Sequence, residues 1–205
     1  MNKIFFLLIL MYLNFISAQN DFQIDYGVEY AGFAIDTASI EDPEVKKYFI
    51  KSEQESKRSL KPDITLVTLN YFSEENLVKV SLVEIMDADE QSSIKSALPG
   101  IIDLKHKLTE SIVYYRDGTR KKEFNLNQVD WEITEDYKNI MGYECQRATT
   151  KFTPRNGKTK TIEAWFTVAI PIPSGPYMYA GLPGLILEVT NHFNRKIYAR
   201  EIKFE

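Results

Sequence analysis

The residues best suited to chemistry in this chain are its single cysteine, Cys145, and its two histidines, His106 and His192. A catalytic thiol needs a pKa lowered by a nearby imidazolium or helix N-terminus. Cys145 lies instead within an expected strand at residues 144–152, on the same face as Tyr143 by alternation. Packing as a small buried apolar group is therefore the favoured interpretation. Thiol catalysis or metal binding by Cys145 is the alternative.

Other motifs for catalysis or cofactor binding are missing from the sequence. The two histidines stand in no zinc-type spacing. Ser174 is flanked by prolines that prevent a nucleophile elbow. Gly181 and Gly184 precede a strand, whereas phosphate loops precede a helix. We therefore expect no metal, no cofactor and no catalytic residue.

Carboxylates gather in two places that could hide a catalytic pair. One cluster holds Asp87, Asp89 and Glu90, and the other holds Glu135 and Asp136. Paired carboxylates perform acid–base chemistry in glycoside hydrolases. Polar turns carry such clusters for solubility, so we favour a solvated role and keep a hydrolase as the alternative.

A proline- and glycine-rich segment, residues 170–184, is the most distinctive loop of the chain. Prolines fix φ and lack an N–H donor, so the segment is neither helix nor central strand. We expect this loop to be exposed, and exposed aromatics and methionine favour contact with a ligand or partner. The candidate contact residues are Tyr177, Met178 and Tyr179 on the loop, with Trp165 and Trp131 on strands.

The end of this loop also supports a purely structural interpretation. Glycines and proline would set a tight turn that threads a core strand beside Trp165 and Tyr143. The turn consists of Gly181, Leu182, Pro183, Gly184, Leu185 and Ile186. The recognition role and the structural role do not exclude each other.

Strand patterns dominate the rest of the sequence. Alternating or β-branched runs predict strands at 22–30, 64–72, 77–85, 112–116, 120–126, 131–134, 144–152, 158–168, 185–189 and 196–204. Turn signals such as Asp117-Gly118 and Asn156-Gly157 separate consecutive strands. Residues 87–109 are ambiguous, and a loop or lid with a short strand fits them. One helix is predicted within 36–61, because Asp42-Pro43 suits a helix start and Val45, Phe49 and Ile50 share a face.

These elements predict a mainly β (α+β) fold. The expected architecture is a single curved antiparallel meander, or half-barrel, with one N-terminal helix packed against it. A concave face lined by strand aromatics would suit an apolar ligand. The aromatics in question are Tyr26, Tyr30, Phe33, Tyr71, Phe72, Tyr114, Tyr115, Trp131 and Trp165.

The N-terminus has the order of a cleavable signal peptide. Lys3 precedes an apolar run, and small residues end at Ala18 before Gln19. The run is too short to span a bilayer, so we expect a signal at 1–18, a single domain at 19–205 and no transmembrane anchor in the mature chain. The protein is then exported to the periplasm or the extracellular space. Its net charge of −4 argues against nucleic acid as a partner.

Blocks between residues 130 and 189 resemble a known family in sequence and order. They are Asp130-Trp131-Glu132-Ile133, Gly142-Tyr143-Glu144-Cys145-Gln146-Arg147-Ala148, Ala164-Trp165-Phe166-Thr167, Ile170-Pro171, Gly175-Pro176 and the run at 181–186. The chain is identified by these blocks as similar to the GLPGLI family of exported bacterial envelope proteins. The resemblance implies a β-rich envelope protein and supplies no catalytic residues.

The function expected from the sequence is non-catalytic binding in the cell envelope. The ligand is lipid-like and apolar, or else the partner is an envelope protein. One alternative is an exported hydrolase that uses Cys145 or a carboxylate pair. The other is an accessory partner of an outer-membrane transporter, displayed through loop 170–184.

Overall fold

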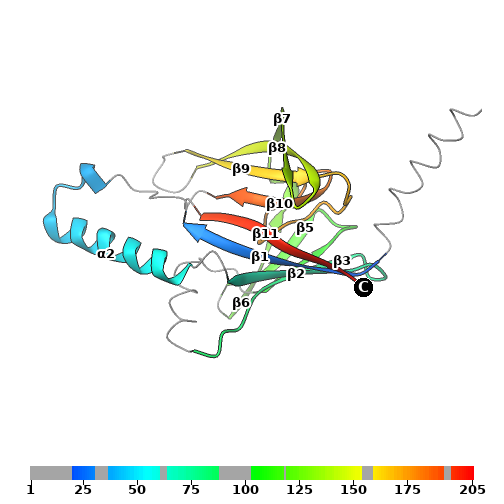
Figure 1. Cartoon of the computed structure of the whole chain (residues 1–205), viewed down its shortest axis with the longest axis horizontal. Coiled ribbons are helices and arrows are strands. Elements are labelled where there is room, and N and C mark those ends of the chain that lie inside the picture. The colour runs from blue at the N-terminus through cyan, green and yellow to red at the C-terminus, as the bar shows by residue number, and fades with distance from the viewer. Residues whose placement is uncertain are drawn as a thin grey trace, which may run out of the picture.

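The residues that the structure describes form one antiparallel sheet with one α-helix beside it (Figure 1). The computed structural model describes residues 20–30, 37–60, 64–87, 103–117, 119–153, 159–191 and 195–205. The elements in chain order are β1 (Phe22–Tyr30), η2 (Thr37–Ser39), α2 (Pro43–Ser59), β2 (Thr65–Phe72), β3 (Leu77–Leu82), β4 (Asp103–Lys107), β5 (Ile112–Asp117), β6 (Arg120–Asn125), η3 (Leu126–Gln128), β7 (Glu132–Ile140), β8 (Tyr143–Phe152), β9 (Lys160–Thr167), β10 (Leu185–Thr190) and β11 (Arg195–Phe204). The mainly β prediction is confirmed.

Consecutive strands pair with each other as a meander, except that β6 and β7 lie at opposite edges and β1 pairs with β11. The order across the sheet is β6-β5-β4-β3-β2-β1-β11-β10-β9-β8-β7. The first and last strands pair in the middle, where Phe22 lies opposite Phe204 and Tyr30 opposite Arg195. The sheet therefore has two arms, β1–β6 and β7–β11, held together by the pairing of the chain's ends.

A short connection forces the sheet to curve. Six residues, 126–131, join β6 to β7, although these strands form opposite edges of an 11-stranded sheet. That connection spans at most about 25 Å when fully extended. A flat sheet of this size would separate its edges by about 48 Å, at about 4.8 Å per strand. The two arms must therefore bend toward each other, as the predicted half-barrel requires.

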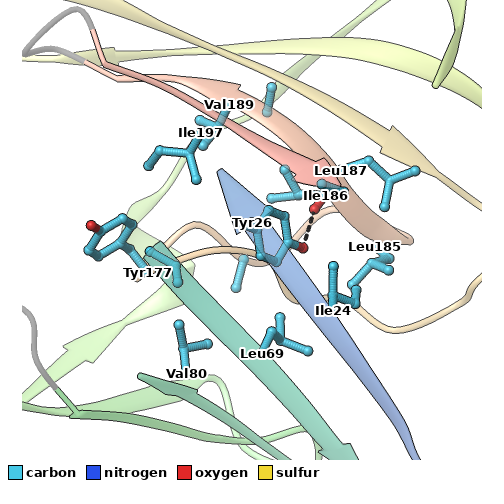
Figure 2. Packing of buried hydrophobic residues seen from close by; sticks show 14 of the residues in the cluster. Ile24, Tyr26, Leu69, Val80, Tyr177, Leu185, Ile186, Leu187, Val189 and Ile197 are labelled. Atoms are coloured by element: carbon cyan, nitrogen blue, oxygen red, sulfur yellow. Dashed lines mark hydrogen bonds between the residues drawn. The ribbon is translucent and has the colours of Figure 1, made fainter. Parts of the chain in front are cut away.

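The hollow between the arms is filled by a segment of the chain itself. Loop 170–184 joins β9 to β10 and contributes buried residues to the main core, among them Ile170, Ile172 and Leu182. The same core includes inward-facing strand residues such as Ile24 and Leu69, which Figure 2 shows together with Tyr177 of the loop. The core therefore lies between the sheet and loop 170–184.

Helix α2 stands beside the sheet. The side chain of Asp42 accepts hydrogen bonds from the backbone N–H groups of Glu44, at 2.8 Å, and Val45, at 3.2 Å. Asp42 is thus the expected N-cap, with Pro43 in the first turn. The helix contacts β1, but Val45 remains 43% exposed and Ile50 also stays exposed. The apolar side expected to pack on the sheet is largely open.

One element differs from the sequence prediction, a second settles an ambiguous stretch, and several predictions lie outside the described residues. β7 has nine residues where a short strand at 131–134 was expected. β4 lies inside the ambiguous stretch 87–109. The signal peptide at 1–18, Phe33, the side chain of Tyr30, and the turn residues Gly118, 155–157 and 192–194 are among those not described.

Candidate functional site

An apolar cavity of about 210 Å³ lies where the two arms approach each other. Phe124 lies on β6 of one arm, and Phe152 and Ile162 lie on β8 and β9 of the other. Because these strands are far apart in the sheet order, the cavity exists only when the sheet is curved. The full lining consists of Phe124, Gln128, Val129, Trp131, Thr150, Lys151, Phe152, Ile162, Met178, Tyr179 and Ala180.

Three residues chosen from the sequence meet in this cavity. Trp131 comes from the connection between β6 and β7, while Met178 and Tyr179 come from loop 170–184. The indole Nε1 of Trp131 donates a hydrogen bond to the backbone oxygen of Ala180 at 3.0 Å. The bond links the connection between β6 and β7 to the loop, two of the segments that line the cavity.

The expectation that loop 170–184 is exposed is wrong. Tyr177 is only 8% exposed, and Met178 and Tyr179 are half-buried. Burial raises the pKa of the Tyr177 and Tyr179 hydroxyls above the usual tyrosine value. Large apolar side chains on a loop suggested a surface, but here they fill the concave side of the sheet. This burial argues against the alternative in which loop 170–184 contacts an outer-membrane transporter.

Tyr177 is held in an unfavourable conformation. Its φ of 58° lies in the left-handed region, which is uncommon for residues other than glycine. Its hydroxyl is buried and has no hydrogen-bond partner among the described residues. Figure 2 shows the ring at the margin of the core, with the hydroxyl directed away from Tyr26. By contrast, the Tyr26 hydroxyl donates to the backbone oxygen of Ile186 at 2.8 Å.

Glycines allow the loop to pack against the backbone of its neighbours. A Cβ added to Gly184 would lie 2.1 Å from the carbonyl oxygen of Thr167, and one added to Gly175 would lie 2.6 Å from the Cβ of Ile186. Gly181 has a φ of +91° and turns the chain toward the strand.

Backbone hydrogen bonds tie the start of β10 to the loop. The N–H of Leu185 donates to Ile170 at 2.9 Å, and that of Ile186 donates to Ser174 at 2.9 Å. Leu182, Leu185 and Ile186 are all buried. Residues 181–186 therefore form a turn and strand start inside the core, and Pro183 alone among the apolar side chains of this run is exposed.

Trp165 does not join the cavity. On β9 the neighbours Ala164 and Phe166 are buried, while Trp165 lies on the opposite face. There the Nζ atom of Lys138 lies 4.2 Å from the ring centroid, and the ring Nε1 donates to Glu163 at 3.0 Å. Trp165 is thus part of a polar surface cluster, separate from Trp131.

The cysteine is placed where a thiolate is disfavoured. Cys145 is fully buried, and burial raises the pKa of its thiol to about 11. Its Sγ lies 3.6 Å from the backbone oxygen of Tyr143. In the register it stands opposite Lys138. A neutral buried thiol suits packing and does not suit nucleophilic catalysis.

His106 is also buried, on β4 of the other arm. Its Nδ1 lies 3.5 Å from the Oγ of Ser174, a residue of loop 170–184. Burial lowers the pKa of the imidazole, while a hydrogen bond that the ring donates to the backbone of Glu110 opposes this shift. The contact joins β4 to the loop but leaves the hydroxyl enclosed by the core, where no substrate reaches it.

The acidic clusters show no arrangement for catalysis. Asp136 forms an ion pair with Arg147, which also approaches Glu163 at 3.6 Å. Glu135 and Asp87 are exposed, and Asp89 and Glu90 lie outside the described residues. In the described part of the chain, no group of three or more His, Cys, Asp or Glu side chains is placed to hold a metal ion.

Sequence reasoning missed most of the cavity. Phe124, Val129, Phe152 and Ile162 come from segments that meet only through the curvature of the sheet. A local pattern gives no sign of such a meeting. The short connection between β6 and β7 was the available signal, but it becomes informative only when the strand order is known.

A family model described as a protein of unknown function (Porph_ging) matches residues 152–188. These residues cover the end of β8, all of β9, loop 170–184 and the start of β10. The comparison with curated proteins finds no match. Within the described residues, no helix is long and apolar enough to cross a membrane.

Two solved structures of a protein titled PNGF-II resemble this chain in fold. One, in space group P21, matches with a TM-score of 0.56, and the other, in space group C2, with a TM-score of 0.54. In both, sequence identity is 14%, and the match covers 91% of this chain but 28% of the other. The chain thus spans less than a third of the length of those proteins, and the likeness concerns the fold alone.

Proposed function

We propose that the protein is an exported, non-catalytic binding protein that holds an apolar group of a lipid-like ligand in the cavity between its two arms. The observation that carries this proposal is the meeting of Trp131, Met178 and Tyr179 in one apolar cavity. Three residues that the sequence marks as candidates for recognition line it, although they come from two separate segments.

The size of the cavity limits what it can hold. An apolar protein cavity of about 150 Å³ binds benzene, whereas pockets for drug-sized ligands measure about 300–1,000 Å³. At about 210 Å³, this cavity accepts a ring or the end of an alkyl chain and leaves the remainder of the ligand outside. The exposed residues Phe152 and Gln128 line the cavity where such a remainder would emerge.

Tryptophan fluorescence tests the binding proposal directly. The chain has two tryptophans, so the variant Trp165→Phe leaves Trp131 as the single reporter. Toluene and n-octanol, added below their solubility limits, serve as ring and alkyl probes. We expect a saturable change in Trp131 emission, because an apolar occupant would replace water or empty space next to the indole.

Two further variants separate the cavity from general effects. Val129→Phe, made in the same background, fills the cavity from a half-buried position and should abolish the response. Val168→Phe adds the same side chain at a position that is 64% exposed and outside the cavity lining, and should leave the response intact. A response that survives Val129→Phe, or no saturable response to either probe, would remove the basis for a ligand in this cavity.

The proposal includes export and membership of the GLPGLI family. Support for the family comes from the match at 152–188, which contains the run at 181–186. Expression of the full chain in a Gram-negative bacterium, followed by mass spectrometry of the periplasmic fraction, tests export. We expect a mature protein that begins at Gln19. A chain that retains residues 1–18 in the cytoplasm would contradict export without affecting the cavity.

A further inference from the structure

A second hollow, of about 550 Å³, lies on the outer face of β2–β6 and has a chemistry opposite to that of the apolar cavity. Alternation along the strands places Val78 and His106 in the core, whereas Lys79 and Lys105 face outward. The hollow is formed by two rows of these outward-facing side chains. We call it the basic groove, and define it by Asn70, Lys79, Ser81, Lys105, Tyr114 and Arg116 with their row neighbours Asp103 and Lys121.

The first row of the groove crosses four strands. Asn70 of β2 lies opposite Lys79 of β3, Lys79 opposite Lys105 of β4, and Lys105 opposite Tyr114 of β5. Residues directly opposite each other on one face have Cβ atoms about 4.5–5.5 Å apart. Two lysines are thus neighbours in this row, with an amide at one end and an aromatic ring at the other.

The second row repeats this arrangement. Ser81 of β3 lies opposite Asp103 of β4, and Arg116 of β5 lies opposite Lys121 of β6. Asp103 approaches Arg116 at 3.7 Å, and it is the single carboxylate among the lining residues. Arg116 and Lys121 are again neighbouring cations, and Asp103 lies within ion-pair distance of Arg116 alone.

The floor between the two rows is backbone. Val80, Leu104 and Tyr115 occupy the intervening positions, and alternation points their side chains to the other face of the sheet. The groove therefore has a closed bottom and walls of cationic and polar side chains. Pockets of about 300–1,000 Å³ suit small-molecule ligands.

The charges of the groove are poorly neutralised from within the chain. Like charges placed directly opposite on one face of a sheet destabilise it, and the groove contains two such pairs, Lys79 with Lys105 and Arg116 with Lys121. In the described part of the chain, Lys105 and Lys121 lie within ion-pair distance of no carboxylate. Lys79 contacts an aromatic ring, with its Nζ 4.3 Å from the centroid of Phe72.

Acidic residues near the groove lie at its margin. The Tyr114 hydroxyl donates to Glu110 at 3.2 Å, and Glu123 stands opposite Tyr114 on β6. Glu110 is itself 3.5 Å from Lys107. Neither carboxylate lines the hollow. A protein with a net charge of −4 thus places five cations around one hollow, the four of the two rows and Lys122.

We propose that the basic groove binds a small polyanion, a molecule with two or more carboxylate, sulfate or phosphate groups. One anionic group lies between Lys79 and Lys105, and a second lies between Arg116 and Lys121. Each replaces repulsion between cations with charge-assisted hydrogen bonds. Asn70 and Ser81 supply neutral hydrogen-bonding groups, and the ring of Tyr114, which is 44% exposed, offers an apolar surface to the ligand's carbon skeleton.

Isothermal titration calorimetry on the purified protein tests this proposal with two probes. Trigalacturonate presents carboxylates on a carbon skeleton, inorganic tripolyphosphate presents phosphates without one, and maltotriose is the neutral control. We expect saturable binding of at least one anionic probe and none of maltotriose. Binding should weaken several-fold between about 50 and 200 mM salt, because exposed charges are screened. Tighter binding of trigalacturonate would identify an organic acid as the ligand class, and tighter binding of tripolyphosphate would identify a phosphorylated one.

Matched charge reversals locate the site. The double variant Lys105→Glu/Lys121→Glu should weaken binding at least about tenfold, since both rows lose a cation. The control Lys46→Glu/Lys47→Glu changes the net charge equally on α2, away from the groove, and should preserve binding. Circular dichroism confirms that both variants fold. Equal losses in the two double variants, or no binding of either anionic probe to the parent protein, would overturn the proposal.

Discussion

Ionisable side chains have opposite surroundings in the interior of the molecule and on the outer face of its sheet. In the interior, burial keeps such groups neutral: the pKa of Cys145 is raised to about 11, and that of His106 is lowered. On the outer face, Lys79, Lys105 and Arg116 line the basic groove. The interior therefore supports packing and apolar binding, while the outer face supports electrostatic recognition. The same strands supply both, since β6 gives Phe124 to the cavity and Lys121 to the groove.

In the interior, Gly184→Ala should cause the largest loss of stability. A Cβ there would lie 2.1 Å from the carbonyl oxygen of Thr167, which is backbone and cannot turn aside. We expect a loss of about 3 kcal/mol or more in the free energy of unfolding, because loop 170–184 must shift out of the core. Urea denaturation followed by circular dichroism measures the loss.

Gly142→Ala is the matched control for this prediction. Gly142 has a φ of +88° with no atom within 4 Å of an added Cβ. Its substitution should cost about 1–2 kcal/mol, from backbone strain alone. If the two variants lose equal stability, the close packing of the loop against β9 does not hold the core together.

The next test concerns Cys145 and bears on the hydrolase alternative. With a thiol pKa of about 11 and a fully buried side chain, the native protein should resist iodoacetamide near pH 8 and react only when unfolded. Cys145→Ser should cost about 1–3 kcal/mol, because it buries a hydroxyl in place of a thiol. Rapid labelling of the native protein, followed by mass spectrometry, would contradict this and restore a reactive thiol.

His106 makes the interior sensitive to acid. Burial lowers its pKa in the folded state, so the unfolded chain takes up the proton first as the pH falls through the ordinary value of 6.5. Stability is thus greatest above that value and is lost as the pH falls below it. Urea denaturation at about pH 8 and about pH 5.5 should show this loss, since both values bracket the ordinary histidine pKa.

Two histidine variants test whether His106 causes the pH dependence of stability. His106→Gln should flatten the pH dependence, while His192→Gln, at the only other histidine, should leave it unchanged. A pH dependence that persists in His106→Gln would mean that other groups carry it. The contact between β4 and Ser174 would then be irrelevant to acid sensitivity.

A smaller effect of opposite sign is expected at Tyr177. Its buried hydroxyl has no partner in the described part of the chain, and an unsatisfied buried polar group costs free energy. Tyr177→Phe should therefore raise stability by about 1 kcal/mol. Tyr26→Phe is the matched control, because it removes a hydroxyl that donates to Ile186, and it should lower stability. Loss of stability in Tyr177→Phe would show that this hydroxyl has a partner in the folded protein.

Local patterns in the sequence predict the strands well where one face is buried. The alternation at 22–30 matches β1, and the hairpin signals match β2–β3 and β5–β6 within a few residues. β7 was predicted too short because most of its side chains are exposed, so no apolar alternation marks it. An edge strand with both faces exposed to solvent has only a weak strand pattern in its sequence.

The candidate sites depend on information that no local pattern contains. The pairing of β1 with β11 joins residues more than a hundred positions apart in the sequence. The approach of β6 to β8 and β9 joins residues a few tens of positions apart. Loops usually lie at the surface because they carry polar backbone groups, and loop 170–184 is an exception. Its internal hydrogen bonds, such as that from Gly181 to Pro173 at 3.1 Å, satisfy that backbone and permit burial.

The smallest expected effect lies on the outer face, at Lys138. Its Nζ lies 4.2 Å from the ring centroid of Trp165 and 2.7 Å from the carboxylate of Glu188. Contacts of this kind at partly exposed positions each contribute about 0.5 kcal/mol, so Lys138→Gln should lower stability by about 0.5–1 kcal/mol. Lys51→Gln removes a more exposed pair with Glu55 on α2 and should change stability by less. Added salt should weaken the Glu188 pair but leave much of the ring contact, since salt screens exposed charges. If both lysine variants behave alike, the outer face near Trp165 is ordinary solvated surface, in contrast to the basic groove.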